Sequence, residues 1–530
     1  MRIQGLVVLF FTFLVENLSC VSQVLTTSNL PIVVVNTNNV TIPNTPKIPA
    51  TMGIIWNEDN SENSILDPFN EYFGQIGIER RGSSSNSFPA KSYSLETRSP
   101  LDSNYNVNIF QMPKDNDWIL YAPYTDKSLI RNVLTYHLGN KLGHWSPRTQ
   151  LCELILNNEY QGVYVFMEKI KINPGRVDIH ENTYSDTQNN SLTGGYIFKI
   201  DKTTEGGVII WNSPYNSIPF NAAIRYQMHD PDYNDMHPTQ LDYLESIVTE
   251  WETKLQSNQF DDPVDGYRKY IDVESFIDFM LINELSKNVD GYRISTFLHK
   301  QRFSEGNKIV AGPLWDFNLG FGNANYCQGG LTTGWEINFN YVCGGGMDNP
   351  FWWNRLLEDP YFANKTHCRW LELRETYLSN EYINNYIDSL ATLLESPSQR
   401  HYQRWPILST YVWPNNFIGD TYQEEIDYLK EWIADRLIWM DNNMFGTCNN
   451  LDLNQTETSE VNFYPNPSSN NLNIINCLNK HIYITDLNGI IVLNYFSKEQ
   501  NKLINIEHIP NGLYFLKVAH EIHKIQIQHD

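Results

Sequence analysis

The sequence has little positive charge. Its 38 lysines and arginines are outnumbered by 61 aspartates and glutamates, and the net charge is −23. Such a chain repels the phosphate backbone, so nonspecific binding to DNA or RNA is not expected. The 41% of hydrophobic and 19% of charged residues rule out wholesale disorder and a coiled coil. With 530 residues, the chain has room for two large or three to four ordinary domains, at about 150 residues each.

Long apolar runs are absent after the first twenty residues. Arg2 precedes the run at 6–15, and the polar residues NLSC follow it, which predicts a secretory signal peptide over residues 1–20. A buried N-terminal helix and a lipoprotein signal ending at Cys20 are the alternatives. No later run approaches the ~20 residues of a membrane-spanning helix, so we expect an exported chain with no transmembrane segment after processing.

Several catalytic and metal motifs are missing as well. There is no C-x-x-C, H-E-x-x-H, G-x-S-x-G, P-loop or G-x-G-x-x-G motif. These absences weigh against structural zinc sites, zinc proteases, serine hydrolases, P-loop ATPases and Rossmann dehydrogenases. Seven cysteines are present, and export makes disulfides possible. Of the many pairings, we favour Cys327 with Cys343 and Cys368 with Cys448, because each pair brackets one compact segment.

The residue patterns predict an α+β protein. Residues 21–51 read as an extended N-terminal segment, and residues 52–202 contain short alternating strands around one helix. Helical spacing dominates after residue 238. A mainly β half followed by a mainly α half predicts a bilobal enzyme with a cleft between the lobes. After a polar linker at 449–460, residues 461–530 predict a small all-β sandwich with Asn-Gly turns at Asn488-Gly489 and Asn511-Gly512.

Two loop aspartates carry the most specific chemical signal. The segment NVDGYRIST places Asp290 just beyond an apolar-faced helix, and VAGPLWDFNLGFG places Asp316 just beyond a strand. In phosphoryl transfer one carboxylate can orient or deprotonate the attacking hydroxyl while the other holds a divalent cation on the phosphates. Either aspartate alone could simply cap a helix or a turn. The Asp-Phe and Phe-Gly pairs of the second loop favour the site.

A Gly/Ser loop supplies candidate phosphate ligands. The segment RRGSSSNSFPAKSY offers Arg81, Gly82, Ser84 and Lys91, whose N–H groups, hydroxyls and charge suit phosphate oxygens. Surface turns of this composition are also common. Further candidates for ion pairs in the β half are Glu168 with Lys169, and Lys199 with Asp201.

These motifs together resemble the spore-coat CotH kinase family. The resemblance covers residues 52–448 and rests on the Gly/Ser loop, the two aspartate loops, and the segments DWILYAPYTDKSLIRNVLTYHLGNKLG and LNNEYQGVYVFMEKI. It implies a bilobal, atypical protein-kinase-like fold that uses ATP with Mg or Mn to phosphorylate exported proteins.

The resemblance also implies roles for single residues. Asp290 is similar to the catalytic aspartate, Asp316 to the metal-binding aspartate, and Trp315 to an aromatic lining the cleft. Ser295 stands where kinase-type loops place a metal-binding Asn, and Asn318 where many family members carry a second Asp. Both changes weaken the expected metal ligands.

Residues 461–530 resemble the type IX secretion sorting domain of Bacteroidetes proteins. The resemblance rests on FYPNPSSNNLNI, ITDLNGIIV and IPNGLYFLKV. It implies that the type IX machinery exports the chain to the cell surface or the medium.

Two alternatives to a kinase stay open. The chain could be a catalytically weakened relative that binds a protein or glycan partner, since 13% of its residues are aromatic. A glycosidase using Asp316 with Glu284 has no motif behind it.

Overall fold

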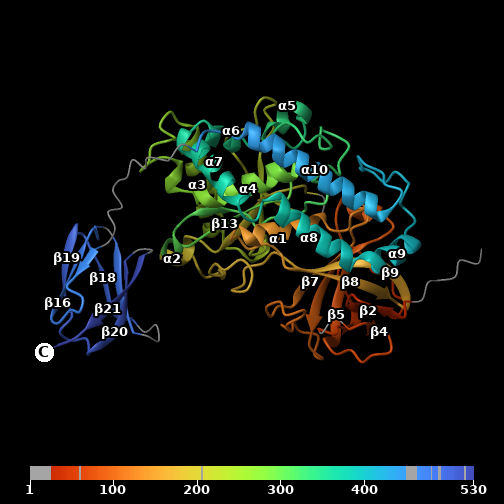
Figure 1. Cartoon of the computed structure of the whole chain (residues 1–530), viewed down its shortest axis with the longest axis horizontal. Helices are drawn as coiled ribbons and strands as arrows, with labels where there is room; N and C mark the ends of the chain where they lie inside the picture. Colours follow the sequence, from red (N-terminus) through yellow and green to blue (C-terminus); the bar gives the residue numbers. More distant parts are fainter. Residues whose placement is uncertain are drawn as a thin grey trace, which may run out of the picture. The chain divides into compact units, whose positions relative to one another are not determined.

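The computed structural model describes residues 25–58, 61–203, 207–448, 462–478, 480–486, 491–518 and 521–529. The chain divides into two compact units, Met1–Cys448 and Asn449–Asp530 (Figure 1). The predicted signal peptide, the linker at 449–460 and the predicted turn at Asn488-Gly489 lie outside the described residues. No helix in the described ranges is both long and apolar enough to cross a membrane.

The larger unit begins with a closed barrel of seven strands. In barrel order they are β2 (Ile32–Asn36), β3 (Ile48–Ile55), β5 (Tyr72–Arg81), β6 (Ser92–Arg98), β7 (Asp117–Tyr121), β9 (Glu159–Glu168) and β8 (Thr149–Leu156). All neighbours are antiparallel except β2 and β8. Alternate side chains, including Val33, Ile78 and Phe166, fill the interior. A short ladder pairs β1 (Thr27–Ser28) with β4 (Asn63–Ser64).

The barrel changes one predicted boundary. The expected start of the domain at Met52 falls inside β3, and the segment before it contributes β2. Closing the barrel requires both strands, since β2 joins β3 to β8. The extended N-terminal segment is therefore part of this domain.

A five-stranded antiparallel sheet and most of the helices follow the barrel. The sheet order is β11 (Ile209–Asn212), β12 (Arg225–Asp230), β10 (Tyr196–Ile200), β13 (Thr296–Lys300) and β14 (Ile309–Ala311). The helices are α2 (Asn189–Leu192), α3 (Pro238–Gln256), α4 (Val273–Ser286), α5 (Phe339–Cys343), α6 (Trp352–Leu357), α7 (Pro360–Arg374), α8 (Asn380–Leu393), α9 (Glu395–Arg404) and α10 (Tyr422–Asn443). This order of β-rich and helix-rich parts agrees with the predicted α+β class; the kinase-like two-lobed arrangement stays a prediction.

Helix α1 (Arg131–Lys141) lies between the barrel and the other helices (Figure 1). Its Val133, Leu134 and Leu138 belong to one apolar cluster with Val165 of the barrel and Leu281 of α4. Polar residues of the same helix, Arg131 and Asn132 among them, are also buried. A buried polar group needs a partner, so these side chains must bond to neighbouring segments.

Two disulfides confirm the favoured pairings. Cys327 bonds Cys343, and Cys368 bonds Cys448, with Cα atoms 5.3 and 4.9 Å apart. Such bonds are typical of exported proteins.

The smaller unit is all-β. One sheet contains β15 (Asn462–Tyr464), β16 (Asn471–Ile475) and β19 (Asn501–Asn505), and the other contains β18 (Ile491–Phe496), β17 (His481–Thr485), β20 (Gly512–Val518) and β21 (Glu521–Ile527). Residues of both sheets, such as Leu472 and Ile484, share one core. The predicted hairpin at Asn511-Gly512 is wrong, because β19 pairs with β16 while β20 pairs with β17 and β21.

Candidate active site

The larger unit contains a cavity of about 880 Å³. Its walls come from the barrel strands, the loop after β5, the five-stranded sheet and the two aspartate loops. Eight of the predicted site residues line it: Arg81, Gly82, Ser84, Asp290, Ser295, Trp315, Asp316 and Asn318. Segments far apart in the sequence thus meet at one cavity.

Asp290 lies four residues beyond α4. Asp272 caps the start of the helix, which ends before Lys287 in the left-handed conformation. Asp290 is buried, and its Oδ1 accepts a hydrogen bond of 2.8 Å from Arg293. Arg293 also donates to the Val289 carbonyl, which fixes its guanidinium beside the carboxylate.

Asp316 follows β14 in a strained conformation. Its φ is +63°, a region that non-glycine residues adopt rarely. Its N–H donates to the Tyr136 hydroxyl (3.1 Å), and the next N–H, of Phe317, donates to Asn132 Oδ1 (2.7 Å). The Asn288 amide donates to the Asp316 carbonyl (3.2 Å). Helix α1 and the first aspartate loop therefore hold the second loop in place.

Among the described residues, no hydrogen bond or ion pair compensates the charge of the Asp316 carboxyl. Burial, together with the negative charges of Asp290 and Asp201, raises its pKa to about 7. Lys202 and Arg81 act in the opposite direction with smaller effect. No hydrogen bond to this carboxylate is present among the described residues. Converging acidic groups with excess negative charge suit a cation.

The donor set fits a hard divalent cation that keeps some of its water. The described residues contain no group of three or more His, Cys, Asp or Glu side chains that could hold a metal ion alone. Mg²⁺ commonly takes one or two carboxylates, with waters and substrate phosphates completing the octahedron. Asp316 can supply such a carboxylate.

Ser295 and Asn318, which stand where the kinase resemblance implies stronger metal ligands, also line the cavity. Ser295 has φ +49°, and its N–H donates to Asp201 Oδ1 (3.3 Å). Asn318 donates its amide to the Thr125 hydroxyl (3.2 Å), which leaves its carbonyl oxygen as the group able to ligate. Both therefore offer neutral oxygens.

The Gly/Ser loop forms another wall of the cavity. Gly82 has φ +101°, and a Cβ there would lie 1.8 Å from Ser85 Oγ, so only glycine fits. The Arg81 guanidinium lies 5.3 Å from the ring centroid of Trp315 and connects this loop to the second aspartate loop.

Two predicted ligands lie outside the cavity. Lys91 donates to the carbonyls of Asn86 (2.6 Å) and Phe88, so it closes the Gly/Ser loop. Glu168 is fully buried and accepts hydrogen bonds of 2.7 and 2.9 Å from the Arg148 guanidinium instead of pairing with Lys169. Both have structural partners, and neither lines the cavity.

Glu284 is also a structural group. It is fully buried, accepts hydrogen bonds from Tyr292 and from the N–H groups of Glu336 and Ile337, and is absent from the cavity wall. This placement removes the partner that a glycosidase using Asp316 would need.

Lysines supply positive charge that the sequence did not assign to phosphate. Lys169, Lys171, Lys199 and Lys202 line the cavity. Lys199 pairs with Asp201 at 2.7 Å, which confirms that predicted ion pair. Burial lowers the pKa of Lys169, and neighbouring Asp117 partly offsets the effect. The cavity thus contains lysine side chains as well as the aspartates Asp290 and Asp316.

The supporting residues of α1 were missed. Asn132 and Tyr136 are spaced i, i+4, so they share one helix face, and both line the cavity. Polar groups at helical spacing within an apolar helix were the available signal, because such groups must find partners.

Comparison with protein-family models identifies both units. A model described as CotH kinase protein matches residues 78–440, which is more than half of the chain. The chain belongs to the CotH kinase protein family. The model of the secretion system C-terminal sorting domain matches residues 462–528, which indicates export to the surface or beyond. A search of curated proteins finds no match.

Proposed function

We propose that this CotH protein is an exported kinase that transfers the γ-phosphoryl group of ATP to a Ser or Thr of another exported protein. The observation that carries the proposal is the meeting of Asp290 and Asp316 with the Gly/Ser loop in one cavity. Phosphoryl transfer depends on positioning and charge stabilisation, which such a cavity can provide.

Asp290 and Asp316 would have different roles in the transfer. Asp290, fixed by Arg293, orients the acceptor hydroxyl and takes its proton. Asp316, helped by Asn318 or Ser295, would hold Mg or Mn; when bound, that ion neutralises charge on the phosphates.

The opposite wall would hold the nucleotide. The Gly/Ser loop offers backbone N–H groups and hydroxyls to phosphate oxygens, with Arg81 and Lys169 adding charge. The Trp315 ring contacts the Arg81 guanidinium and stacks on the Tyr136 ring, with the two ring centroids 6.2 Å apart. Lys91 supports the loop indirectly through its two carbonyl contacts.

The deciding experiment is nucleotide binding by the full chain. ATP with Mg or Mn should raise the melting temperature, because a ligand that binds the native state stabilises it. Asp316→Asn should remove the metal-dependent part of the rise, while Asp427→Asn, a surface change on α10, should not. No shift at millimolar ATP would refute the proposal.

One observation favours a binding protein instead. Trp413 lines the cavity, is 48% exposed and stacks on Tyr326 at 5.9 Å. Exposed aromatic faces suit sugar rings and apolar side chains. Wild type that binds glycans on an array, Trp413→Ala that does not, and a melting temperature that does not respond to ATP would together support this second function.

A further inference from the structure

A second, smaller cavity of about 280 Å³ lies behind the second aspartate loop. Gly312, Pro313 and Leu314 line this small cavity, whereas Trp315 and Asp316, the next two residues, line the large one. One short segment thus separates the two spaces. The proposed kinase reaction makes no use of the small cavity.

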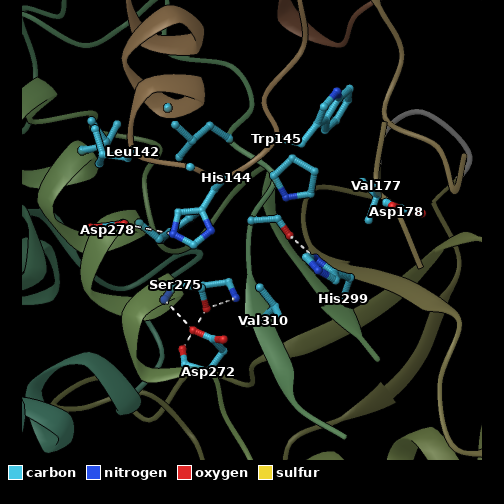
Figure 2. Close-up of a pocket in the computed structure, with 18 of the residues that line it drawn as sticks. Leu142, His144, Trp145, Val177, Asp178, Asp272, Ser275, Asp278, His299 and Val310 are labelled. Atoms are coloured by element: carbon cyan, nitrogen blue, oxygen red, sulfur yellow. Dashed lines mark hydrogen bonds and ion pairs between the residues drawn. The ribbon is translucent and has the colours of Figure 1, made fainter. Parts of the chain in front are cut away.

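Apolar side chains form most of the wall. Leu142, just beyond the end of α1, lines the cavity together with Trp145, Val177 and Val310, all labelled in Figure 2. Phe279 and Ile282 of α4 complete this surface. A cavity of this size and lining suits a compact hydrocarbon body.

His299 offers a hydrogen-bond acceptor to this cavity. Its Nδ1 lies 3.2 Å from the Gly312 carbonyl, which can only accept, so Nδ1 carries the proton. Burial lowers the pKa of His299 to about 4, and the ring is neutral at pH 7. The lone pair then resides on Nε2, for which the described residues provide no donor.

Asp272 offers a second acceptor. Its Oδ1 accepts the Ser275 N–H at 2.9 Å as the α4 N-cap, and its other oxygen has no hydrogen bond among the described residues (Figure 2). Asp272 and His299 are near enough for the carboxylate to affect the ring electrostatically. Lys308 donates to the carbonyls of Arg268 and Lys269 and does not pair with Asp272. Exposed Asp178 adds a further carboxylate at the wall.

Most donors of the wall are engaged or closed off, although the side-chain amide of Gln301 also lines the cavity and can both donate and accept. His144 Nε2 bonds Asp278 at 2.9 Å, and Arg369 also donates to Asp278. Arg176 donates to the carbonyls of Lys169 and Asp117. The indole N–H of Trp145 has no partner but is closed off from solvent. The available polar groups are therefore mainly acceptors, two of them anionic.

We propose that the small cavity binds a primary ammonium group on a compact hydrocarbon body. The ammonium would donate to Asp272 and to Nε2 of His299, and the body would pack on Phe279, Ile282 and Leu314. Either a free small amine or a lysine side chain of another polypeptide has this chemistry. The site is independent of the proposed kinase reaction.

Calorimetry on the full chain tests the proposal with three matched probes. Phenethylamine, 2-phenylethanol and phenylacetate share one body and differ in the charge of the head group. We expect the amine to bind about tenfold or more tightly than the alcohol, since a charge-assisted hydrogen bond contributes more than a neutral one. Phenylacetate should not compete with the amine. Equal binding of the three, or no binding at millimolar concentration, would overturn the proposal.

Two variants localise the binding. Asp272→Asn keeps an effective N-cap but removes the charge, so it should fold and lose the preference for the amine over the alcohol. Asp427→Asn, which removes an exposed carboxylate bonded to Gln423 on α10, should retain it. Preference preserved in Asp272→Asn would contradict the assignment.

A last arm separates the two sources of the ligand. Nα-acetyl-lysine methylamide competes with phenethylamine if the site accepts a lysine side chain. Tighter binding of the lysine derivative would identify a polypeptide partner, and tighter binding of phenethylamine a free amine. Both results support the site, and binding of neither refutes it.

Discussion

The two aspartate loops of the large cavity contain the same side chain in different surroundings. Asp290 follows the long helix α4 and has an arginine partner at 2.8 Å. Asp316 follows the three-residue strand β14, has no cation partner in the described ranges, and has a raised pKa. Such differences in environment allow two carboxylates to take different parts in one reaction. An aspartate oriented by an arginine suits proton transfer, whereas one short of positive charge suits a cation.

The loops also differ in how they are supported. Arg293, which holds Asp290, lies over the Phe339 ring at 4.1 Å. The Asp316 loop depends on α1, where Arg131 reaches the carbonyls of Gly320 and Phe321 in addition to the contacts of Asn132 and Tyr136. Asp290 therefore depends on an arginine of its own loop, which contacts residues about 50 positions later, whereas the Asp316 loop depends on a helix about 180 residues earlier.

The largest effect should come from Asp290→Asn. Loss of a positioned base commonly lowers turnover by about 10²- to 10⁴-fold. The Asn side chain keeps the shape and can still contact Arg293, so nucleotide with metal should still raise the melting temperature. Transfer of labelled phosphate from ATP and thermal shift measure the two effects separately. A full-activity Asp290→Asn variant would remove the proposed distinction between the two loops.

Asn132→Ala should weaken the Asp316 loop. The change leaves the N–H of buried Phe317 without its 2.7 Å partner, which costs about 1–3 kcal/mol of unfolding free energy. Urea unfolding measures the loss, and the nucleotide affinity should fall with it.

Asn140→Ala is the matched control on the same helix. Asn140 bonds Ser146 and not the Asp316 loop, so its removal should lower stability without changing nucleotide affinity. Equal affinities in the two variants would show that α1 does not position the loop.

The sequence predicts the two aspartates of the site better than it predicts the charged residues around them. Asp290 and Asp316 were found because each follows an apolar run in a distinctive Asp-Gly or Asp-Phe context. Lys91 was chosen for its charge beside a Gly/Ser loop, but local geometry directs it to two carbonyls. Glu168 was chosen as a neighbour of Lys169, but it is the last residue of β9 and its buried carboxylate bonds Arg148, whereas Lys169 lies beyond the strand and lines the cavity.

Long-range pairing explains the remaining differences. Residues 32–36 contain only a short β-branched run, and nothing local shows that β2 will pair with β8, more than a hundred residues later. The Asn511-Gly512 dipeptide favours a hairpin locally, but the strands beside it pair with other partners. In both places the tertiary structure overrides the local signal.

The pH dependence of stability should reveal Asp316. Its carboxyl has a pKa near 7 in the folded chain against 3.8 as the ordinary value, so the folded state binds more protons between these pH values. Its contribution to stability is complete below about pH 4 and is lost as the pH rises toward 7. As the pH rises from 4 to 7, the melting temperature of wild type should fall relative to that of Asp316→Asn. Parallel curves for the two proteins would contradict the raised pKa.

The smallest expected effect is a gain from Ser295→Asn. Ser295 has φ +49°, and Asn is among the residues that tolerate this conformation. An amide oxygen at this position would add reach toward the cation that a hydroxyl lacks, so the affinity for Mn with ATP should rise about threefold, or ~0.6 kcal/mol. Ser295→Ala controls for the backbone and should not improve binding. If both variants bind metal and nucleotide as wild type does, Ser295 lies outside the metal site, and the difference between the two loops rests on Asp316 alone.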